Sequence, residues 1–392
     1  MNEKMYELGA APSAIRELFA YGLKRKAEIG AENVFDFSLG NPSVPAPDAI
    51  ADAMRAALEL PPMQLHSYSP AQGSPECRSA IAANLNKRFG TDYSADDLYM
   101  TMGAAAALDA CITALTNPGD EVIVIAPYFP EYRVWIENAG CTCVEVPARA
   151  SDFQIDVPAV KAALSTKTRA IIVNSPNNPV GTVYTRANLE ELADMLRQEE
   201  AELGAPIYVI SDEPYRELAY GDAQVSWMPD IYADTLVCYS WSKSFSLPGE
   251  RIGYVLVPPA AADARRVYLA VCGAGRVLGY VCAPTILQKA VAECIDTPVN
   301  VDAYVHNRKL LTDMLDELGY EYIQPDGAFY LWMKALEPDA QAFSNKAKEH
   351  ELLIVASDSF GVEGWVRVSY CVGEGVITGS RAAFVALKAD YE

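Results

Sequence analysis

The sequence predicts an α/β protein in which helices cover a mostly parallel β-sheet, followed by a smaller α+β region. Short β-branched runs alternate with amphipathic stretches between about residues 98 and 257, a pattern typical of βαβ units. Each run ends in turn-forming or polar residues, where open α/β sheets bind ligands. The chain is 51% apolar and 21% charged, which indicates a globular protein with a large core.

The expected strands of the sheet are EVIVIA (121–126), RAIIVN (169–174), IYVIS (207–211), TLVCYS (235–240) and IGYVLV (252–257). Segment 285–318 predicts one or two long helices that leave the sheet. Short strand-like runs then follow at 329–333, 352–357 and 366–370. We therefore expect a large domain over residues 45–295 and a small domain built from 1–44 plus 296–392.

The charge of the chain excludes several partners. Lys plus Arg number 31 against 52 Asp plus Glu, a net charge of 31 − 52 = −21. This excess of negative charge disfavours binding to nucleic acids and to anionic membrane surfaces. No stretch approaches the roughly 20 apolar residues of a membrane span, and the first 19 residues lack an apolar signal region. We expect a soluble cytoplasmic protein.

Cysteine and histidine usage indicates neither a disulfide framework nor a metal site. The nine Cys are scattered without a CxxC pair, and there are only three His. Cys141 and Cys143 lie in an expected strand and point to the same face. We expect two buried apolar thiols there in preference to a redox pair.

The strongest chemical signal is YSWSKSFSLPGERIG (239–253), in which Lys243 follows an apolar strand and precedes Arg251 by eight positions. Burial near another cation lowers the pKa of an ammonium group and makes the amine a nucleophile able to form a Schiff base. The alternative is a solvated loop lysine.

Four other segments are ambiguous when taken singly. Asp212 in SDEPY either holds a heteroaromatic nitrogen protonated or caps a helix. Asn178 in SPNNPVG either displays its amide or only forms a turn. TMGAAAALDA (101–110) offers backbone N–H groups to a phosphate or is an ordinary helix start. Phe129 in PYFPEY stacks on a planar ligand or packs in the core.

Taken together, the order and spacing of these segments resemble the fold-type I pyridoxal-phosphate enzymes, specifically the class I/II aminotransferases of the aspartate aminotransferase superfamily. The likeness runs along nearly the whole chain and also includes LGNPSVPAP, YSPAQGSPECRSAIA, PDGAFYLW and WVRVSY. It implies a seven-stranded, mostly parallel sheet in the large domain, pyridoxal 5'-phosphate as cofactor, and transfer of an amino group from an L-amino acid to a 2-oxo acid.

The resemblance also implies catalytic roles. Lys243 would form the Schiff base with the cofactor and then shuttle a proton at the substrate Cα. Asp212 would keep the pyridine nitrogen protonated, so that the ring acts as an electron sink. Asn178 and Tyr215 would hydrogen-bond the 3'-oxygen.

Further family positions concern the phosphate and the ring. Arg251, Ser240 and the backbone around Gly103 and Ala104 would hold the phosphate. Phe129 would stack on the pyridine ring. Each of these roles follows from the resemblance alone.

The resemblance extends to the substrate and to a second subunit. Arg367 would grip the substrate α-carboxylate through its bidentate fork, with Gly40 beside it. Tyr68 occupies the place of a family tyrosine that reaches the phosphate of the neighbouring subunit. The resemblance therefore implies a homodimer with shared active sites.

The sequence departs from one bacterial aspartate aminotransferase subgroup at Ala105, where that subgroup has a lysine for the distal carboxylate. Arg276 either replaces this cation or has a structural role. Because the cations assigned so far serve the phosphate and one carboxylate, we predict a preference for neutral, aromatic or aliphatic, amino donors.

Two other functions stay open at this point. Relatives that catalyse β-elimination and other lyase reactions use the same Lys, Asp and Asn. A regulatory protein would carry an aminotransferase-like domain behind a DNA-binding one, but only about 40 residues precede LGNP, and the net charge opposes DNA.

Overall fold

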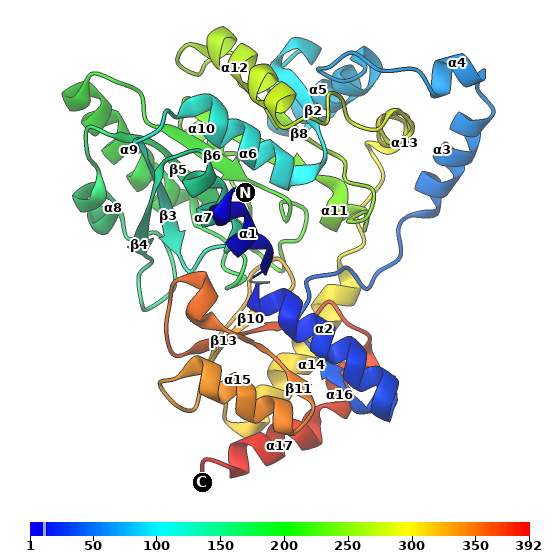
Figure 1. Cartoon of the computed structure of the whole chain (residues 1–392), viewed down its shortest axis with the longest axis vertical. Helices are drawn as coiled ribbons and strands as arrows, with labels where there is room; N and C mark the ends of the chain where they lie inside the picture. Colours follow the sequence, from blue (N-terminus) through cyan, green and yellow to red (C-terminus); the bar gives the residue numbers. More distant parts are fainter. Residues whose placement is uncertain (11–12) are drawn as a thin grey trace.

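The computed structural model describes residues 1–10 and 13–392; positions 11–12 of the expected N-terminal segment lie outside the described residues. In Figure 1 the β-sheet and its helices form the upper part of the molecule, and the C-terminal elements form the lower part together with α2. The N-terminal helix α1 (Glu3–Ala10) lies in front of the junction between the two parts.

The upper part contains a seven-stranded sheet with the order β2-β8-β7-β6-β5-β3-β4. Its strands are β2 (Leu98–Thr101), β3 (Glu121–Ala126), β4 (Thr142–Pro147), β5 (Thr168–Asn174), β6 (Tyr208–Asp212), β7 (Thr235–Ser240) and β8 (Gly253–Leu256). Only β8 pairs antiparallel with its neighbours, β2 and β7. The mostly parallel sheet is thus confirmed, and each of the five expected runs forms a strand.

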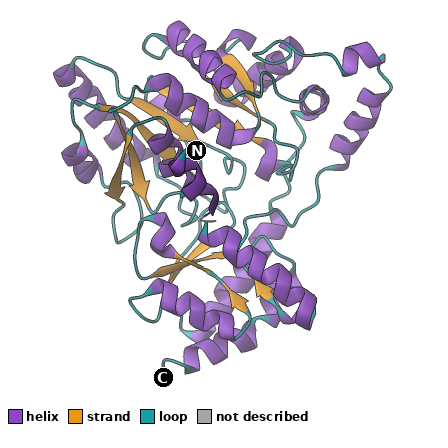
Figure 2. Cartoon of the chain, in the orientation of Figure 1, coloured by secondary structure: helices purple, strands orange, loops and turns teal. Residues whose placement is uncertain are grey.

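Helices cover both faces of this sheet (Figure 2). Those of the upper part are α3 (Asp48–Leu58), α4 (Pro62–Leu65), α5 (Pro75–Phe89), α6 (Gly103–Leu115), α7 (Glu131–Asn138), α8 (Val157–Ala163), α9 (Arg186–Leu203), α10 (Met228–Ile231), α11 (Trp241–Ser244), α12 (Ala264–Val277) and α13 (Thr285–Cys294), with the short 3-10 helix Ala95–Asp97. Side chains of alternate residues of β3 point to opposite faces of the sheet, as the two-residue period of a strand requires. Val122 and Val124 pack with α6 and α12, whereas Ile123 packs with α8 and α9.

Local sequence signals set the ends of the longer helices. Ser74 caps α5 by accepting the Cys77 N–H at 3.1 Å, and α5 ends at Gly90 in the left-handed conformation. Thr185 and Gly204 play the same two roles for α9. A hydroxyl at the N-cap satisfies a free helical N–H, and glycine adopts the left-handed cap without strain.

The lower part contains a four-stranded sheet with the order β12-β13-β10-β9. Its strands are β9 (Tyr322–Ile323), β10 (Tyr330–Lys334), β12 (Val355–Ala356) and β13 (Trp365–Ser369), and a separate parallel pair joins β1 (Phe35–Asp36) to β11 (Leu352–Leu353). Its helices are α2 (Ala14–Ile29), α14 (Asp302–Leu318), α15 (Ala340–Glu349), α16 (Glu374–Gly379) and α17 (Arg381–Ala389), with 3-10 helices at Ala31–Asn33 and Ser357–Phe360. The expected helical segment 285–318 is two helices, α13 and α14.

The strand register brings polar residues together at one edge of the large sheet. Asn174 at the end of β5 is opposite Asp212 at the end of β6, and Asp212 is opposite Cys238 of β7. The chain passes from β7 directly into α11, which carries Lys243. The carboxyl ends of three parallel strands therefore meet where a ligand of an α/β sheet would bind.

Across residues 1–10 and 13–392, no helix combines the length and apolar character needed to cross a bilayer. The same residues contain no group of three or more His, Cys, Asp or Glu side chains placed to hold a metal ion.

Candidate active site

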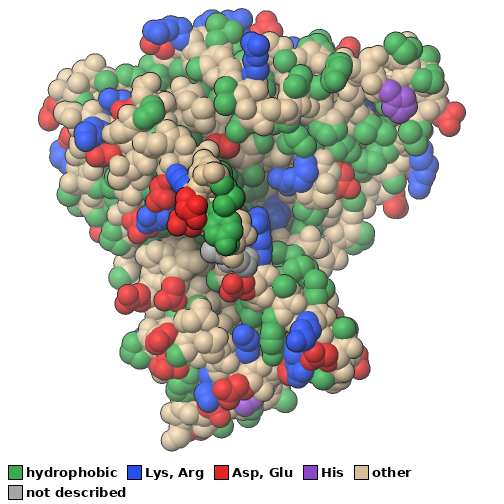
Figure 3. All heavy atoms as spheres, in the orientation of Figure 1, with side chains coloured by type: hydrophobic (Ala, Val, Ile, Leu, Met, Phe, Trp, Pro, Cys, Tyr) green, Lys and Arg blue, Asp and Glu red, His purple; other side chains and the backbone are tan. Residues whose placement is uncertain are grey.

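A cavity of about 260 Å³ lies at the carboxyl ends of β5, β6 and β7. Figure 3 shows the molecule hollowed beside α1, between its upper and lower parts, with Lys and Arg atoms in the hollow. Ten of the residues that the sequence assigns to the site line this cavity: Gly40, Ala104, Phe129, Asn178, Asp212, Tyr215, Ser240, Lys243, Arg251 and Arg367.

Lys243 points its amine into the cavity from α11. Its Nζ donates a hydrogen bond to the Gly40 carbonyl at 2.6 Å and lies 5.4 Å from the centre of the Phe329 ring. Burial lowers the pKa of Lys243 to about 8, the net result after an opposing effect of Cys371 and smaller lowering effects of the Arg367 and Arg251 charges. The amine is thus neutral in a useful fraction of molecules near neutral pH and is available as a nucleophile and base.

Asp212 is buried at the end of β6 with one oxygen free. Its Oδ2 accepts a hydrogen bond from the Tyr132 hydroxyl and one from Asn174 Nδ2 at 3.4 Å. Its Oδ1 has no hydrogen-bond partner among the described residues. Burial raises the pKa of Asp212 to about 7, partly offset by the Tyr132 bond. A buried carboxyl group with an unused oxygen fits a cationic N–H group of a ligand.

Arg367 enters the cavity from β13 and is held on two sides. Its Nη1 donates to Asn178 Oδ1 at 3.0 Å, and its Nη2 donates to the Ser38 carbonyl at 2.6 Å. Its Nε is buried and has no partner among the described residues, and burial lowers its pKa. A fixed guanidinium with spare donors fits a carboxylate. Asn178 Oδ1 accepts the hydrogen bond from Arg367, so Nδ2 is the group of Asn178 that can donate to a ligand.

Gly40 leaves room that a side chain would fill. A Cβ atom at Gly40 would lie 1.9 Å from the hydroxyl oxygen of Tyr330. The same hydroxyl is 2.9 Å from that of Tyr215, and the Tyr330 ring lies 4.6 Å from Arg367 Cζ. Tyr330, which the sequence did not indicate as a site residue, therefore supports three predicted ones.

Arg251 and the start of α6 form an anion cradle. Gly103 has φ +81°, and a Cβ atom there would lie 2.8 Å from Arg251 Nη2. Arg251 is fixed through Nη1, which donates to the Pro248 carbonyl at 3.1 Å. Ser240 precedes α11 without capping it through its side chain, so its hydroxyl is available to a ligand. Free helical N–H groups, a guanidinium and a hydroxyl suit a phosphate.

Apart from Gly103, which lies against Arg251, two predicted site residues do not line the cavity of their own chain. Tyr68 is 89% exposed in the segment after α4. Arg276 is exposed near the end of α12. Neither side chain lines the cavity in the single chain, so their predicted roles stay untested.

Sequence reasoning missed several supporting residues. Tyr132 and Asn174 hold Asp212, and Ile15 and Trp135 line the cavity. Tyr132 belongs to PYFPEY, whose place after a strand was the available signal. Ile15, in contrast, comes from α2, more than 200 residues away from Lys243 in the sequence. Contacts of that kind leave no local signal.

The predicted pair of thiols near β4 is partly confirmed. Cys141 is buried and precedes the strand, whereas Cys143 lies within it and is only partly buried. Burial raises the pKa of Cys143 to about 12. Both thiols are free.

Comparisons with known proteins agree with this geometry. The family model for aminotransferase class I and II matches residues 32–377. A probable aspartate/prephenate aminotransferase of Thermus aquaticus is 32% identical over 346 residues, covering 86% of each chain. An aspartate aminotransferase of Streptomyces avermitilis is 30% identical over 392 residues, covering 94% of this chain and 93% of that protein.

Solved structures show the same likeness. The crystal structure of an aminotransferase from Eubacterium rectale is 52% identical, with a TM-score of 0.98 over 100% of this chain and 99% of that one. The aspartate aminotransferase of Thermus thermophilus with maleate is 29% identical, with a TM-score of 0.86 over 96% and 97%. These relatives favour amino-group transfer over the lyase alternative. The chain belongs to the class I and II aminotransferase family and is an aminotransferase.

Proposed function

We propose that this aminotransferase binds pyridoxal 5'-phosphate in the 260 Å³ cavity and moves an amino group from an L-amino acid to a 2-oxo acid. One observation carries the proposal. The unpartnered Oδ1 of Asp212 and the amine of Lys243 line the same cavity, as a pyridine nitrogen and an aldehyde on one ring require. When bound, the cofactor would carry the amino group and act as an electron sink.

The residues around the ring then have defined tasks. The Asp212 carboxylate holds a proton at the ring nitrogen, with Tyr132 and Asn174 fixing its orientation. Asn178 Nδ2 and the Tyr215 hydroxyl donate to the 3'-oxygen. The Lys243 amine, whose pKa is about 8, removes a proton from the substrate Cα and would deliver it to the cofactor carbon that bears the amino nitrogen, because a base of that pKa is poised near neutral pH.

Other residues bind and orient the reactants. Arg251, Ser240 and the N–H groups at Gly103 and Ala104 bind the phosphate. Arg367 binds the substrate α-carboxylate, and Phe129 stacks on the ring. Support for these tasks comes from the fixed position of Arg367 and from the space left at Gly40 and Gly103.

The test of this proposal compares Lys243→Ala with a control, Lys346→Ala, in which a partly exposed lysine on α15 is removed. With pyridoxal phosphate supplied, wild type and control should show a visible absorbance band that borohydride abolishes. Mass spectrometry should then locate the cofactor on Lys243. Lys243→Ala should lack this adduct and lose at least about 10²-fold in rate. A wild-type protein without a cofactor band would refute the proposal.

We further propose that the enzyme works as a homodimer in the cytoplasm, with Tyr68 reaching the phosphate of the partner subunit. Tyr68 is 89% exposed, and Met63 and Val277 are also largely exposed at 80% and 79%. Large exposed apolar side chains are typical of protein interfaces. The nine scattered cysteines favour a reducing compartment.

The cavity supports a preference for neutral amino donors. Among the described residues, its cationic lining consists of Lys243, Arg251 and Arg367, each of which has a task above. Ala105, Leu108 and Trp135 give the rest of the lining an apolar character. A steady-state comparison of L-phenylalanine, L-leucine, L-alanine, L-aspartate and L-glutamate tests this preference. A kcat/KM for the acidic donors far above every neutral one, in wild type and Arg276→Ala alike, would contradict it.

A further inference from the structure

A second cavity, of about 450 Å³, is formed by residues that have no task in the reaction. It shares no lining residue with the active-site cavity. The two cavities nevertheless meet at one short segment. Trp241 and Phe245 line the second cavity, whereas Ser242 and Lys243 line the first. A ligand in the second cavity would therefore contact the segment that carries Lys243.

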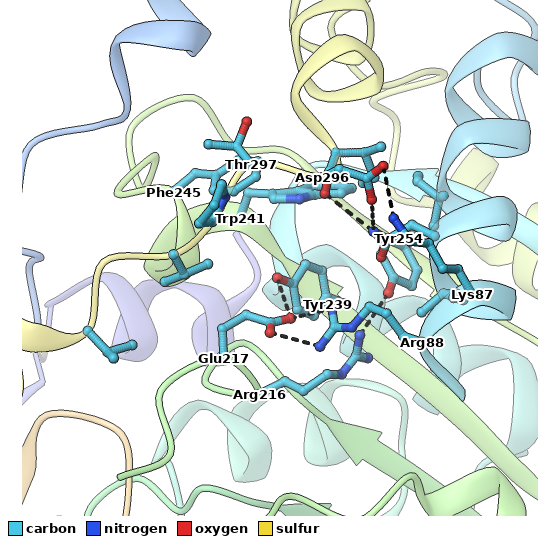
Figure 4. Close-up of a pocket in the computed structure, with 17 residues that line it drawn as sticks. Lys87, Arg88, Arg216, Glu217, Tyr239, Trp241, Phe245, Tyr254, Asp296 and Thr297 are labelled. Atoms are coloured by element: carbon cyan, nitrogen blue, oxygen red, sulfur yellow. Dashed lines mark hydrogen bonds and ion pairs between the residues drawn. The ribbon is translucent and has the colours of Figure 1, made fainter. Parts of the chain in front are cut away.

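The same cavity contacts the connection between the upper and lower parts of the molecule. Residues 295–301 join α13 to α14, and 295–299 of this connection line one side of the cavity. Figure 4 shows Asp296 and Thr297 of this connection on one side of the cavity, with Arg216 and Glu217 on the other and Tyr239 between them. An occupant would touch the connection and the lysine-bearing segment at once.

Arg88 and Glu217 form a polar pair at this cavity with hydrogen-bonding capacity to spare. The two terminal nitrogens of Arg88 each donate to one Glu217 oxygen at 2.8 Å. A guanidinium has five N–H donors, so three remain. Glu217 also accepts a hydrogen bond from the Tyr239 hydroxyl at 3.4 Å, which leaves further lone pairs. The Arg88 side chain is 35% exposed and that of Glu217 16%, so both can meet a ligand.

The remaining charges at the cavity are matched. Arg216 forms a buried ion pair with Glu213. Lys87 forms an ion pair with Asp296, with 3.7 Å between Nζ and Oδ2. A cavity without surplus charge does not favour a phosphate or a dicarboxylate. It suits a ligand that carries one charge of each sign.

Apolar side chains also line this cavity. Trp241 and Phe245 line the cavity, and Val299 and Val301 of the connection are partly buried there. The volume falls within the range of about 300–1,000 Å³ that small-molecule sites occupy. The cavity thus offers an apolar surface next to a paired cation and anion.

We propose that the second cavity binds an apolar L-amino acid as a regulatory ligand. Its carboxylate would receive the spare N–H donors of Arg88, its ammonium would donate to Glu217, and its side chain would lie against Val299 and Trp241. Binding would act on the reaction through the 241–245 segment, which holds Lys243.

Equilibrium dialysis with excess radiolabelled L-phenylalanine, without an oxo-acid acceptor, tests the site. Wild type, Arg367→Gln and the control Arg55→Gln, an exposed arginine on α3, should retain binding at this site. Arg88→Gln and the nearly isosteric Glu217→Gln should weaken it at least tenfold. The proposal is overturned if binding depends on Arg367 and not on Arg88, or if L-phenylalanine does not bind. Circular dichroism melting identifies a variant that fails to fold.

A second measurement tests the coupling and rests on the proposed cofactor. L-Phenylalanine should shift the pH midpoint of the cofactor band in Arg367→Gln, which lacks the substrate arginine, but not in Arg367→Gln/Arg88→Gln. Binding through Arg88 with an unchanged midpoint would overturn the coupling. Because the dialysis needs no cofactor, a failure of the proposed cofactor chemistry would not be mistaken for a failure of the site.

Discussion

Asp212 shows how a single buried residue can be prepared for a ligand that completes its bonding. The carboxyl group is buried, has one oxygen without a partner in the described part of the chain, and has a pKa raised to about 7 by burial. Its ionised form is therefore unfavourable in the cofactor-free protein. A cationic N–H group would supply the missing partner and the countercharge.

This arrangement predicts a pH effect on the stability of the cofactor-free protein. The pKa of Asp212 rises from 3.8 to about 7 on folding, so the folded state binds the proton more tightly. The resulting stabilisation is present below about pH 4 and is lost as pH rises through about 7. The Asp212→Asn variant has no ionisable group at this position, so its free energy of unfolding should not show this loss. Urea unfolding from pH 4 to 8 should show wild type losing on the order of 3–4 kcal/mol relative to Asp212→Asn.

The matched control for that measurement is Asp222→Asn, which changes an exposed aspartate. Its unfolding free energy should follow the wild-type trend. Saturation with pyridoxal phosphate should reduce the difference between wild type and Asp212→Asn, because the ring nitrogen then offsets the charge. A pH-independent difference in the cofactor-free proteins would contradict this account of Asp212.

Gly40→Ala should impair substrate binding, because the added Cβ would lie 1.9 Å from the Tyr330 hydroxyl oxygen. Displacement of Tyr330 would disturb its contacts with Tyr215 and Arg367. We expect KM for the amino donor to rise at least about tenfold, which corresponds to about 1.4 kcal/mol. Tyr330→Phe in the same chain should restore part of the loss. Gly9→Ala, where no atom of the described residues lies within 4 Å of the added Cβ, should match wild type.

At the level of elements, the anion cradle depends on the contact between the first residue of α6 and the first residue of β8. Gly103 begins α6 and Gly253 begins β8. A Cβ at Gly253 would lie 2.4 Å from the Tyr239 carbonyl and 2.9 Å from the Gly103 carbonyl carbon. The close backbone contact places Arg251, two residues before β8, against the first turn of α6. The anion cradle is therefore a product of packing between two elements.

Gly103→Ala tests this element-level contact against a control with similar backbone strain. Gly103 and Gly90 both have positive φ, +81° and +69°, so alanine is strained at either position. Only at Gly103 would the new Cβ meet Arg251, at 2.8 Å. We expect Gly103→Ala to raise the Kd for pyridoxal phosphate at least about tenfold, and Gly90→Ala to leave it unchanged. Equal effects of the two variants on a fluorescence titration would disprove the cradle.

At the level of the whole molecule, the exposed position of Tyr68 bears on whether one chain holds a complete active site. Tyr68 does not line the cavity of its own chain and is 89% exposed. In a homodimer with shared sites, each site would combine Lys243 of one subunit with the partner's Tyr68. Activity would then belong to the assembly and not to the single chain.

Hybrid dimers can test this arrangement. Lys243→Ala should be inactive and Tyr68→Ala weakened. When the two are dissociated and reassembled together, mixed dimers contain one site with both native residues. Activity should rise above the sum of the separate proteins, towards one quarter of wild type, since half of the dimers are mixed and each has one native site. Mixing Lys243→Ala with Lys346→Ala is the control, and no gain over the separate proteins would refute shared sites.

Local sequence patterns are sufficient to predict much of the central sheet. The runs at β3, β5, β6, β7 and β8 are β-branched and apolar because strands buried on both faces require it. The strand β2 is not among the five expected runs, because its four residues, LYMT, include one β-branched residue, and β4, which is half exposed, is expected only as the strand of Cys141 and Cys143. Whether a short or partly exposed segment forms a strand depends on what packs against it, which the local sequence does not show.

The sequence alone determined the strands of the central sheet and a set of polar residues at their carboxyl ends, because strand periodicity and turn residues are local properties of the chain. Only the tertiary structure decided that Asp212 keeps one oxygen free, that Tyr330 supports Gly40 and Arg367, and that a second cavity adjoins Trp241. Those features depend on contacts between residues far apart in the chain, since burial and hydrogen-bond pairing are fixed only when the elements pack.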